Sequence, residues 1–202
     1  MEETALLTDD EIVALCAADG RPWPLGLATV EPTSEELARA GVRGMRSLMV
    51  RRLAGGAADR PGVRPHQMIA RDVAAFLDAT DRVGAYIAPA SDHSVLGGAA
   101  VTAARTPDGW VLDSSTAAGV HALRVASAGE AVAAVLELAE RAYDGTLFVN
   151  DDERSSWVCV VTYGPDAQNV VAVGHRSVTG TVDGAAVTDW DAELVRKAFA
   201  ER

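Results

Sequence analysis

The sequence has little lysine and little cysteine. Lys197 stands alone beside seventeen arginines, and 29 Asp and Glu residues leave the 202-residue chain with a net charge of −11. This negative balance opposes the wrapping of nucleic acid, whose phosphates require many cationic contacts. Cys16 and Cys159 could form one disulfide but no disulfide framework, and we expect two reduced, buried thiols.

Long apolar runs are missing as well. None approaches the roughly 18–20 residues that cross a bilayer, so we expect no membrane span. The N-terminal Met1-Glu2-Glu3 is acidic and carries no basic segment of a secretory signal. A composition of 49% hydrophobic and 23% charged residues is typical of a globular chain and argues against disorder. These features together predict a soluble, cytoplasmic protein.

Catalytic motifs do not stand out in the sequence. The four histidines have no metal-pair spacing, the cysteines form no CxxC motif, and the glycine pairs lack the context of a phosphate loop. Ser91-Asp92-His93 holds the residue types of a hydrolase triad, but adjacent residues cannot face one another in that geometry, so a turn is predicted. The acidic segment Asn150–Glu153 lacks calcium-loop spacing and predicts a solvated hairpin tip. We therefore expect no catalytic residue, no metal and no cofactor.

The first 80 residues predict mainly helices. Capping boxes at Thr8–Glu11 and Thr33–Glu36 open two of them, which end at Gly20 and near Leu53. A third helix is expected from Pro65 to Asp78. Between these helices the sequence predicts a short strand over Leu25–Val30 and a Gly, Pro and Arg-rich loop over Ala57–Pro65.

The pattern changes to strands from Arg82 onward. Short β-rich runs separated by turn residues indicate antiparallel hairpins, because a parallel crossover needs a dozen residues or more. These runs are Val83–Ala88, Val95–Ala104, Trp110–Leu112 and Val120–Val125, followed by a helix from Ser127 to Tyr143. The order then partly repeats, with a hairpin of Trp157–Tyr163 and Val170–Val173, a turn at Thr181–Ala185 and a helix over about Asp189–Ala200.

These elements predict one α+β domain over residues 1–202, with helices packed on an antiparallel sheet. Its parts are a mainly helical segment (1–80) and two strands-then-helix segments (82–143 and 146–202). Continuous apolar runs indicate strands buried on both faces. The central strands are therefore expected to contain Trp157, Val158, Val160, Val161, Val171 and Val173.

Charge is distributed unevenly along the chain. Residues 39–71 hold eight arginines against the single acid Asp59, whereas residues 113–175 hold nine acids against three arginines. Such polarity favours an oriented partner or a self-complementary assembly such as a homodimer; the alternative is a pair of solvated faces. On the helix from Thr33 the apolar positions Leu37, Gly41, Met45, Leu48 and Met49 share one side, and Arg39, Arg43 and Arg46 lie opposite.

Four features follow one another along the chain: Leu7-Thr8-Asp9-Asp10-Glu11, the segment Pro22-Trp23-Pro24-Leu25, Thr33-Ser34-Glu35-Glu36-Leu37, and a last strand Val120–Val125 that leads into an alanine-rich helix. In this order they resemble the EspG family, the chaperones associated with ESX (type VII) secretion in actinobacteria. The resemblance covers residues 5–143, whereas Gly174-His175-Arg176 departs from the C-terminal strand of that family. It implies a cytoplasmic chaperone that holds a helical secreted protein of the PE/PPE or a related type.

The leading hypothesis is thus a non-enzymatic adaptor for a helical protein partner. The alternative is a small-molecule-binding or regulatory α+β domain with its ligand between sheet and helices. An adaptor needs an accessible apolar surface, since exposed aromatic side chains anchor interfaces. The candidate partner-binding residues are Trp23, Leu25, Arg39, Arg43, Arg46 and Trp110, although each tryptophan could equally belong to the core.

Overall fold

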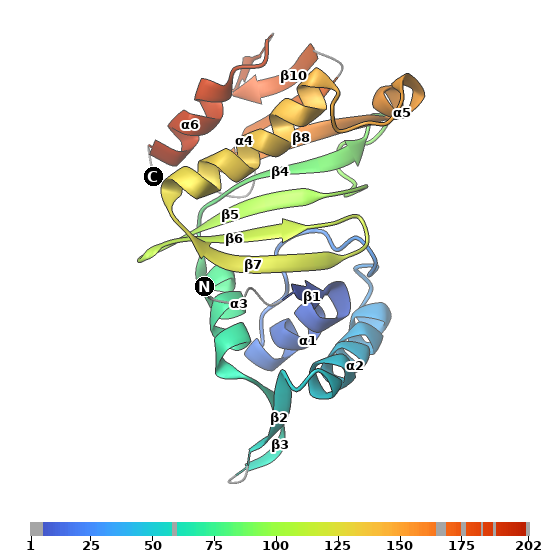
Figure 1. Ribbon diagram of the computed structural model, residues 1–202, viewed down its shortest axis with the longest axis vertical. Coiled ribbons are helices and arrows are strands. Elements are labelled where there is room, and N and C mark those ends of the chain that lie inside the picture. The colour runs from blue at the N-terminus through green and yellow to red at the C-terminus, as the bar shows by residue number, and fades with distance from the viewer. Residues whose placement is uncertain are drawn as a thin grey trace.

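A computed structural model describes residues 6–57, 60–164, 169–174, 177–182, 184–187 and 189–200 (Figure 1). It confirms an α+β fold with helices packed on an antiparallel sheet. In chain order the elements are β1 (Leu6–Thr8), α1 (Asp9–Asp19), α2 (Ser34–Val50), β2 (Ala54–Ala57), β3 (Arg60–Pro65), α3 (Gln67–Asp78), β4 (Arg82–Pro89), β5 (Ala100–Thr106), β6 (Gly109–Ser115), β7 (Val120–Ala126), α4 (Ala128–Asp144), α5 (Asp151–Ser156), β8 (Trp157–Gly164), β9 (Asn169–Gly174), β10 (Ser177–Val182), β11 (Ala185–Ala186) and α6 (Ala192–Ala200).

The main sheet consists of two meanders that meet at the pair β4–β8. Its nine strands run in the order β1-β7-β6-β5-β4-β8-β9-β10-β11, and every pairing is antiparallel. Strands β4 to β7 extend to one side and are followed by α4, and strands β8 to β11 extend to the other side and are followed by α6. The two strands-then-helix segments of the sequence therefore form the two halves of one sheet.

Helices α4 and α6 cover one face of this sheet (Figure 1). Because successive side chains of a strand point to opposite faces, the core beneath α4 takes alternate residues such as Val83, Ala85, Cys159 and Val161. Val160 points to the other face and is also 0% exposed, so β8 is buried on both sides, as its unbroken apolar run predicts. Of the remaining residues expected in the centre, Val171 and Val173 are buried, and Trp157 and Val158 are partly buried.

Helices α1, α2 and α3 form a second group at the β5–β7 part of the opposite face, with the β2–β3 hairpin extending beyond them (Figure 1). The predicted capping box is present, with the Glu11 amide donating to Thr8 Oγ1 and Glu11 Oε2 accepting from the Thr8 amide. The buried Glu11 carboxylate also accepts hydrogen bonds from Ser47 Oγ at 2.7 Å and Arg51 Nη1 at 2.6 Å. One glutamate thus joins the start of α1 to the end of α2.

The contact side of α2 is rotated from the predicted one. Ala40, Gly44 and Leu48 are buried, whereas Met49, which was placed on the apolar side, is 46% exposed. A Cβ atom on Gly44 would overlap the Asp10 carbonyl oxygen, so α1 and α2 touch backbone to backbone at this point. Small residues at intervals of four allow this approach, which a count of large apolar residues overlooks.

Other expectations about local structure were wrong. Leu25–Val30 forms no strand, and the amide and hydroxyl of Thr29 within it donate to the Asp9 carboxylate instead. The predicted loop over Ala57–Pro65 includes strand β3, which pairs with β2. Strand β5 begins at Ala100 rather than Val95, since the ring of Trp157 occupies the place of a side chain at Gly97.

Helix boundaries also shifted, and two elements were missed. The Asp191 side chain accepts a hydrogen bond from the Glu193 amide, so α6 begins at Ala192 rather than near Asp189. Asn150 caps the short helix α5, where a hairpin tip was expected. Strand β1 was likewise not predicted. Among the described residues, no helix is long and apolar enough to cross a membrane.

Candidate functional site

Both candidate tryptophans are packing residues. Trp110 is 6% exposed and its ring lies 4.7 Å from that of Phe199 in α6. Trp23 is partly buried, stacks on Phe76 at 4.5 Å and meets the edge of His121 at 5.9 Å. Leu25 packs beside Trp23 against the core of the helical group. Trp110 thus belongs to the core, which is the alternative that the sequence left open, whereas internal neighbours cover Trp23 only in part.

The arginines of α2 do lie on its exposed side, but two of them already have partners. Arg43 donates to both oxygens of Asp10 at 2.8 Å and to Glu36 at 2.8 Å, which raises its pKa. Arg39 pairs with Glu35 and Glu36. These acids precede residue 39, so the count over residues 39–71 overstated the free positive charge. Arg46 is exposed and has no ion pair within the part of the chain that the structure describes.

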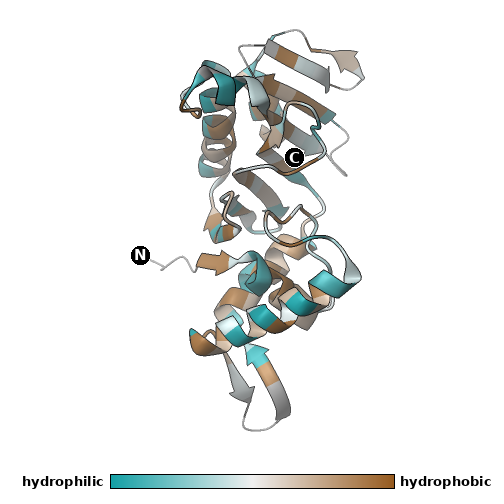
Figure 2. Ribbon diagram, turned by 90° about the vertical axis from the view of Figure 1, so that its right-hand side faces the viewer, coloured by the Kyte–Doolittle hydropathy of each residue, from teal (hydrophilic) through white to brown (hydrophobic). Residues whose placement is uncertain are grey.

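Between these charges, α2 presents apolar side chains to solvent. Positions 35, 38, 39, 42, 46 and 49 share the side of the helix that faces away from α1, and we call this set the α2 surface. Val42 is 53% exposed and lies in a shallow depression beside Ala38, Arg39 and Arg46. In Figure 2 the ribbon of α2 faces the viewer and is coloured mainly as hydrophilic, with hydrophobic residues at the end near the hairpin.

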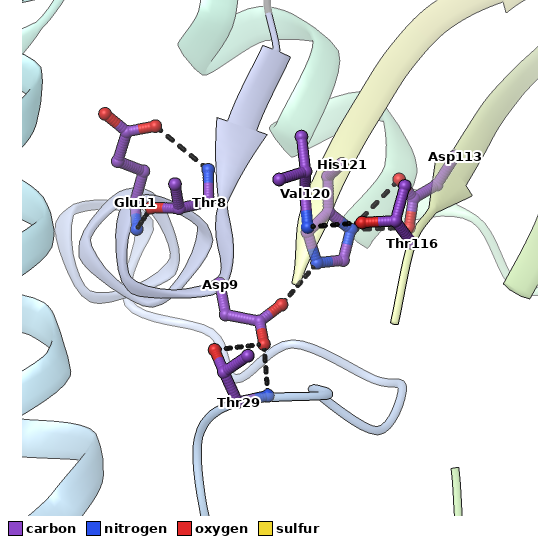
Figure 3. Close-up of polar contacts among 8 residues, drawn as sticks. All are labelled: Thr8, Asp9, Glu11, Thr29, Asp113, Thr116, Val120 and His121. Carbon is purple, nitrogen blue, oxygen red and sulfur yellow. Dashed lines mark hydrogen bonds and ion pairs between the residues drawn. The ribbon is translucent and has the colours of Figure 1, made fainter. Parts of the chain in front are cut away.

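The most unusual polar feature is a histidine held between two aspartates. His121 of β7 is 2% exposed, its Nδ1 lies 3.0 and 3.1 Å from the two Asp113 oxygens, and its Nε2 lies 2.7 Å from Asp9 Oδ1 (Figure 3). Asp9 Oδ2 accepts from the Thr29 amide at 2.6 Å and the Thr29 hydroxyl at 2.8 Å. We refer to Asp9, His121 and Asp113 as the Asp–His–Asp cluster.

The cluster favours the charged form of its histidine. Burial by itself lowers the pKa of His121, but hydrogen bonds and charge attraction from Asp113 and Asp9 outweigh burial and raise that pKa to about 9. For Asp9, burial raises the pKa, but the hydrogen bonds from His121 and Thr29 lower it below its usual value. At neutral pH His121 is therefore an imidazolium ion and lies between the side chains of Asp9 and Asp113.

This arrangement does not form a catalytic triad. Both ring nitrogens of His121 are engaged by carboxylates, so neither is free to take a proton from the neighbouring Ser115. Within the described residues, no three His, Cys, Asp or Glu side chains are placed to hold a metal ion. The chemistry that the cluster supports is electrostatic: it joins the start of α1 to strands β6 and β7.

The cluster was not foreseen from the sequence. Asp9 has the role of a first-turn acid in a capped helix, and His121 was considered only for metal-pair spacing. One local signal existed, because Asp113 directly follows the apolar run Trp110–Leu112 and His121 lies between Val120 and Ala122 in a strand-like run. A polar residue at such a position must find a partner when buried.

Two other features match their predictions. Cys16 and Cys159 are buried free thiols, and burial raises the pKa of each to about 12, so they are protonated and unreactive at neutral pH. The segment around Ser91–His93 is a turn, in which the Asp92 carboxylate accepts hydrogen bonds from the amide and hydroxyl of Ser94.

No family model and no curated protein sequence matches this chain.

Proposed function

We propose that the protein is a non-enzymatic adaptor that binds an amphipathic helix of a protein partner on the α2 surface. The observation that carries the proposal is the row of accessible apolar residues on α2, flanked by arginines. Val42 and Met49 are 53% and 46% exposed and lie two helical turns apart on one side. A partner helix with apolar residues at intervals of three and four can pack along such a row.

Exposed apolar side chains are concentrated in this part of the protein. Nine large hydrophobic residues of the described chain are exposed, and five of them lie between residues 42 and 68. Those five are Val42, Met49, Val50, Val63 and Met68. Because exposed apolar residues on a monomer are normally scattered, their concentration on α2, the hairpin and the start of α3 supports an interaction surface.

Positive charge on α2 and around the β2–β3 hairpin favours an acidic partner. Arg46, Arg52 and Arg64 are exposed and have no ion pair within the described part of the chain. Acidic residues beside the apolar stripe of the partner would neutralise them and would steer association. The resemblance to EspG chaperones supports a helical secreted protein as this partner and the cytoplasm as the place of binding.

The test uses the full chain as bait for affinity purification from its native host. The variant V42D/M49D introduces two carboxylates on the α2 surface, and V125D is its matched control, since Val125 is 60% exposed on β7. We expect a helical protein to co-purify in equimolar amount with the wild type and V125D, and to be lost with V42D/M49D. Retention of that protein by V42D/M49D, or capture of none, would contradict the proposal.

A second copy of the chain could also occupy the α2 surface. Analytical ultracentrifugation of the purified protein tests this by measuring its oligomeric state. A monomer agrees with an external partner. A dimer that V42D/M49D dissociates would assign the α2 surface to self-association and overturn the adaptor proposal.

A further inference from the structure

A cavity of about 450 Å³ lies on the sheet face that α1 and α3 cover only in part. Its floor is formed by β4 to β8, and its walls come from Pro24–Gly26 and from the segment with Ser94 and Leu96. These two segments touch, since a Cβ atom on Gly26 would lie 3.3 Å from Leu96 Cβ. A volume of this size is typical of sites that hold small molecules.

Strand register explains why the cavity is both open and polar. One row across four neighbouring strands lies on the cavity face of the sheet and consists of Thr162, Gly84, Thr102 and Asp113. The next row contains Tyr86, Ala100, Ser115 and His121. Glycine and alanine in the middle of these rows leave space above the sheet, and the surrounding residues supply hydroxyl and charged groups.

Three of these hydroxyl groups have no internal partner. The side chains of Thr102, Ser115 and Thr162 form no hydrogen bond with any other described residue. Thr102 and Ser115 are only 7% and 9% exposed. Hydroxyl groups that line a cavity and have no protein partner are available to bond to a ligand or to water in that space.

The cavity also contains a cation without a counter-ion. Arg82 is partly buried, its Nη2 donates to the Phe76 carbonyl oxygen at 2.8 Å, and its guanidinium lies 5.3 Å from the Phe76 ring centre. Its Nε atom is buried and has no hydrogen-bond partner, and within the described residues no carboxylate lies at ion-pair distance. Burial lowers the pKa of Arg82, which is the effect of an uncompensated charge.

We infer that this cavity binds a small hydroxylated organic anion, whose carboxylate or phosphate group pairs with Arg82. Guanidinium is suited to such groups because its planar donors match two anionic oxygens. Arg82 on β4 and Asp113 on β6 are separated by two strand spacings across the sheet and two residues along the strand, which together span about 12 Å of backbone. The ligand hydroxyl groups bond to the hydroxyl side chains of the floor and to the Asp113 carboxylate.

This site agrees with the alternative hypothesis drawn from the sequence, a small-molecule-binding domain with its ligand between sheet and helices. It is independent of the adaptor proposal.

Isothermal titration calorimetry on the full chain tests binding of four compounds in the millimolar range. Gluconate presents a carboxylate and glucose 6-phosphate a phosphate, while glucose and glucosamine are the neutral and cationic controls. We expect at least one of the two anions to bind and neither control to bind, and the comparison distinguishes a carboxylate from a phosphate ligand.

Variants test the assignment to Arg82. R82Q should weaken binding of the anion about ten-fold or more, because it removes the cation that pairs with it. The R82Q variant should fold, because the glutamine amide can still donate to the Phe76 carbonyl oxygen and the substitution removes an uncompensated buried charge. R105Q is the matched control, because Arg105 is an exposed arginine whose side chain points to the other face of the sheet. T102V, close in shape, should also weaken binding, whereas R105Q and V42D/M49D should bind as the wild type does.

Absence of binding by both anions to the folded wild type would overturn the inference. Equal binding by the wild type and R82Q would do the same. Each outcome is independent of whether a protein partner is captured on the α2 surface.

Discussion

His121 Nε2 lies 2.7 Å from Asp9 Oδ1, although 112 positions separate the two residues in the chain. The Asp9 amide also donates to the Gly119 carbonyl oxygen at 2.9 Å, and Leu7 pairs with His121 across β1 and β7. Both the charges and the backbone therefore attach the start of α1 to the edge of the sheet. Because the α2 surface is carried by α1, this attachment also positions the surface proposed to bind a partner.

Stability should decrease as the pH rises above neutrality. The pKa of His121 is raised from 6.5 to about 9 in the folded protein, so its stabilising contribution is complete below the unfolded value and is lost as pH rises toward 9. A shift of this size corresponds to about 3 kcal/mol of unfolding free energy. Urea denaturation at several pH values between about 6 and 9.5 measures it, and H121N should flatten the profile. A flat wild-type profile would contradict the assignment.

Asp9→Asn should destabilise the protein by about 3 kcal/mol, because it removes one carboxylate of a buried ion pair and leaves the imidazolium poorly compensated. The neighbouring Asp10 is the control, since it lies in the same helical turn and pairs with Arg43 at the surface. Asp10→Asn should cost less than about 1 kcal/mol. Equal losses in the two variants, measured by urea denaturation, would show that the Asp–His–Asp cluster adds nothing beyond an effect on the helix terminus.

Gly44→Ala should destabilise, although alanine favours helices by about 1 kcal/mol over glycine. The added methyl group would overlap the Asp10 carbonyl oxygen and force α2 away from α1. Gly41→Ala tests the same change one turn earlier, where the Cβ atom would lie 3.8 Å from Val13 Cγ1 in ordinary contact. We expect a lower melting temperature for Gly44→Ala and an unchanged or higher one for Gly41→Ala. The opposite order would disprove the close contact of the two helices.

Val160→Asp should cost about 3 kcal/mol or more, because it places an unpaired carboxylate at a position that is 0% exposed. Val125→Asp makes the same substitution on β7 at a side chain that is 60% exposed, so little change is expected there. Thermal unfolding followed by circular dichroism compares the two. An unchanged melting temperature for Val160→Asp would show that β8 is not part of the core.

Local signals were sufficient for the fold class and for much of the element order. The capping box at Thr8–Glu11 acts over three residues and starts α1 as its sequence indicates. Ser127 caps α4 as predicted, whereas at Thr33–Glu36 only the bond from the Glu36 amide to the Thr33 side chain forms. The unbroken apolar run around Val160 and Val161 predicts a strand buried on both faces, and both side chains are fully buried. Short turns between strands limited the sheet to antiparallel hairpins, since no room existed for a crossover.

The contacts that define the sites depend on residues far apart in the chain. Arg43 receives its counter-ion from Asp10, 33 positions away, and His121 receives one of its partners from Asp9. The periodicity of a helix or strand indicates on which side of the element a residue lies. It does not indicate which other element packs against that side. The order β1-β7-β6-β5-β4-β8 settles that question, because it brings Asp9, Asp113 and His121 together and leaves Arg82 above an uncovered part of the sheet.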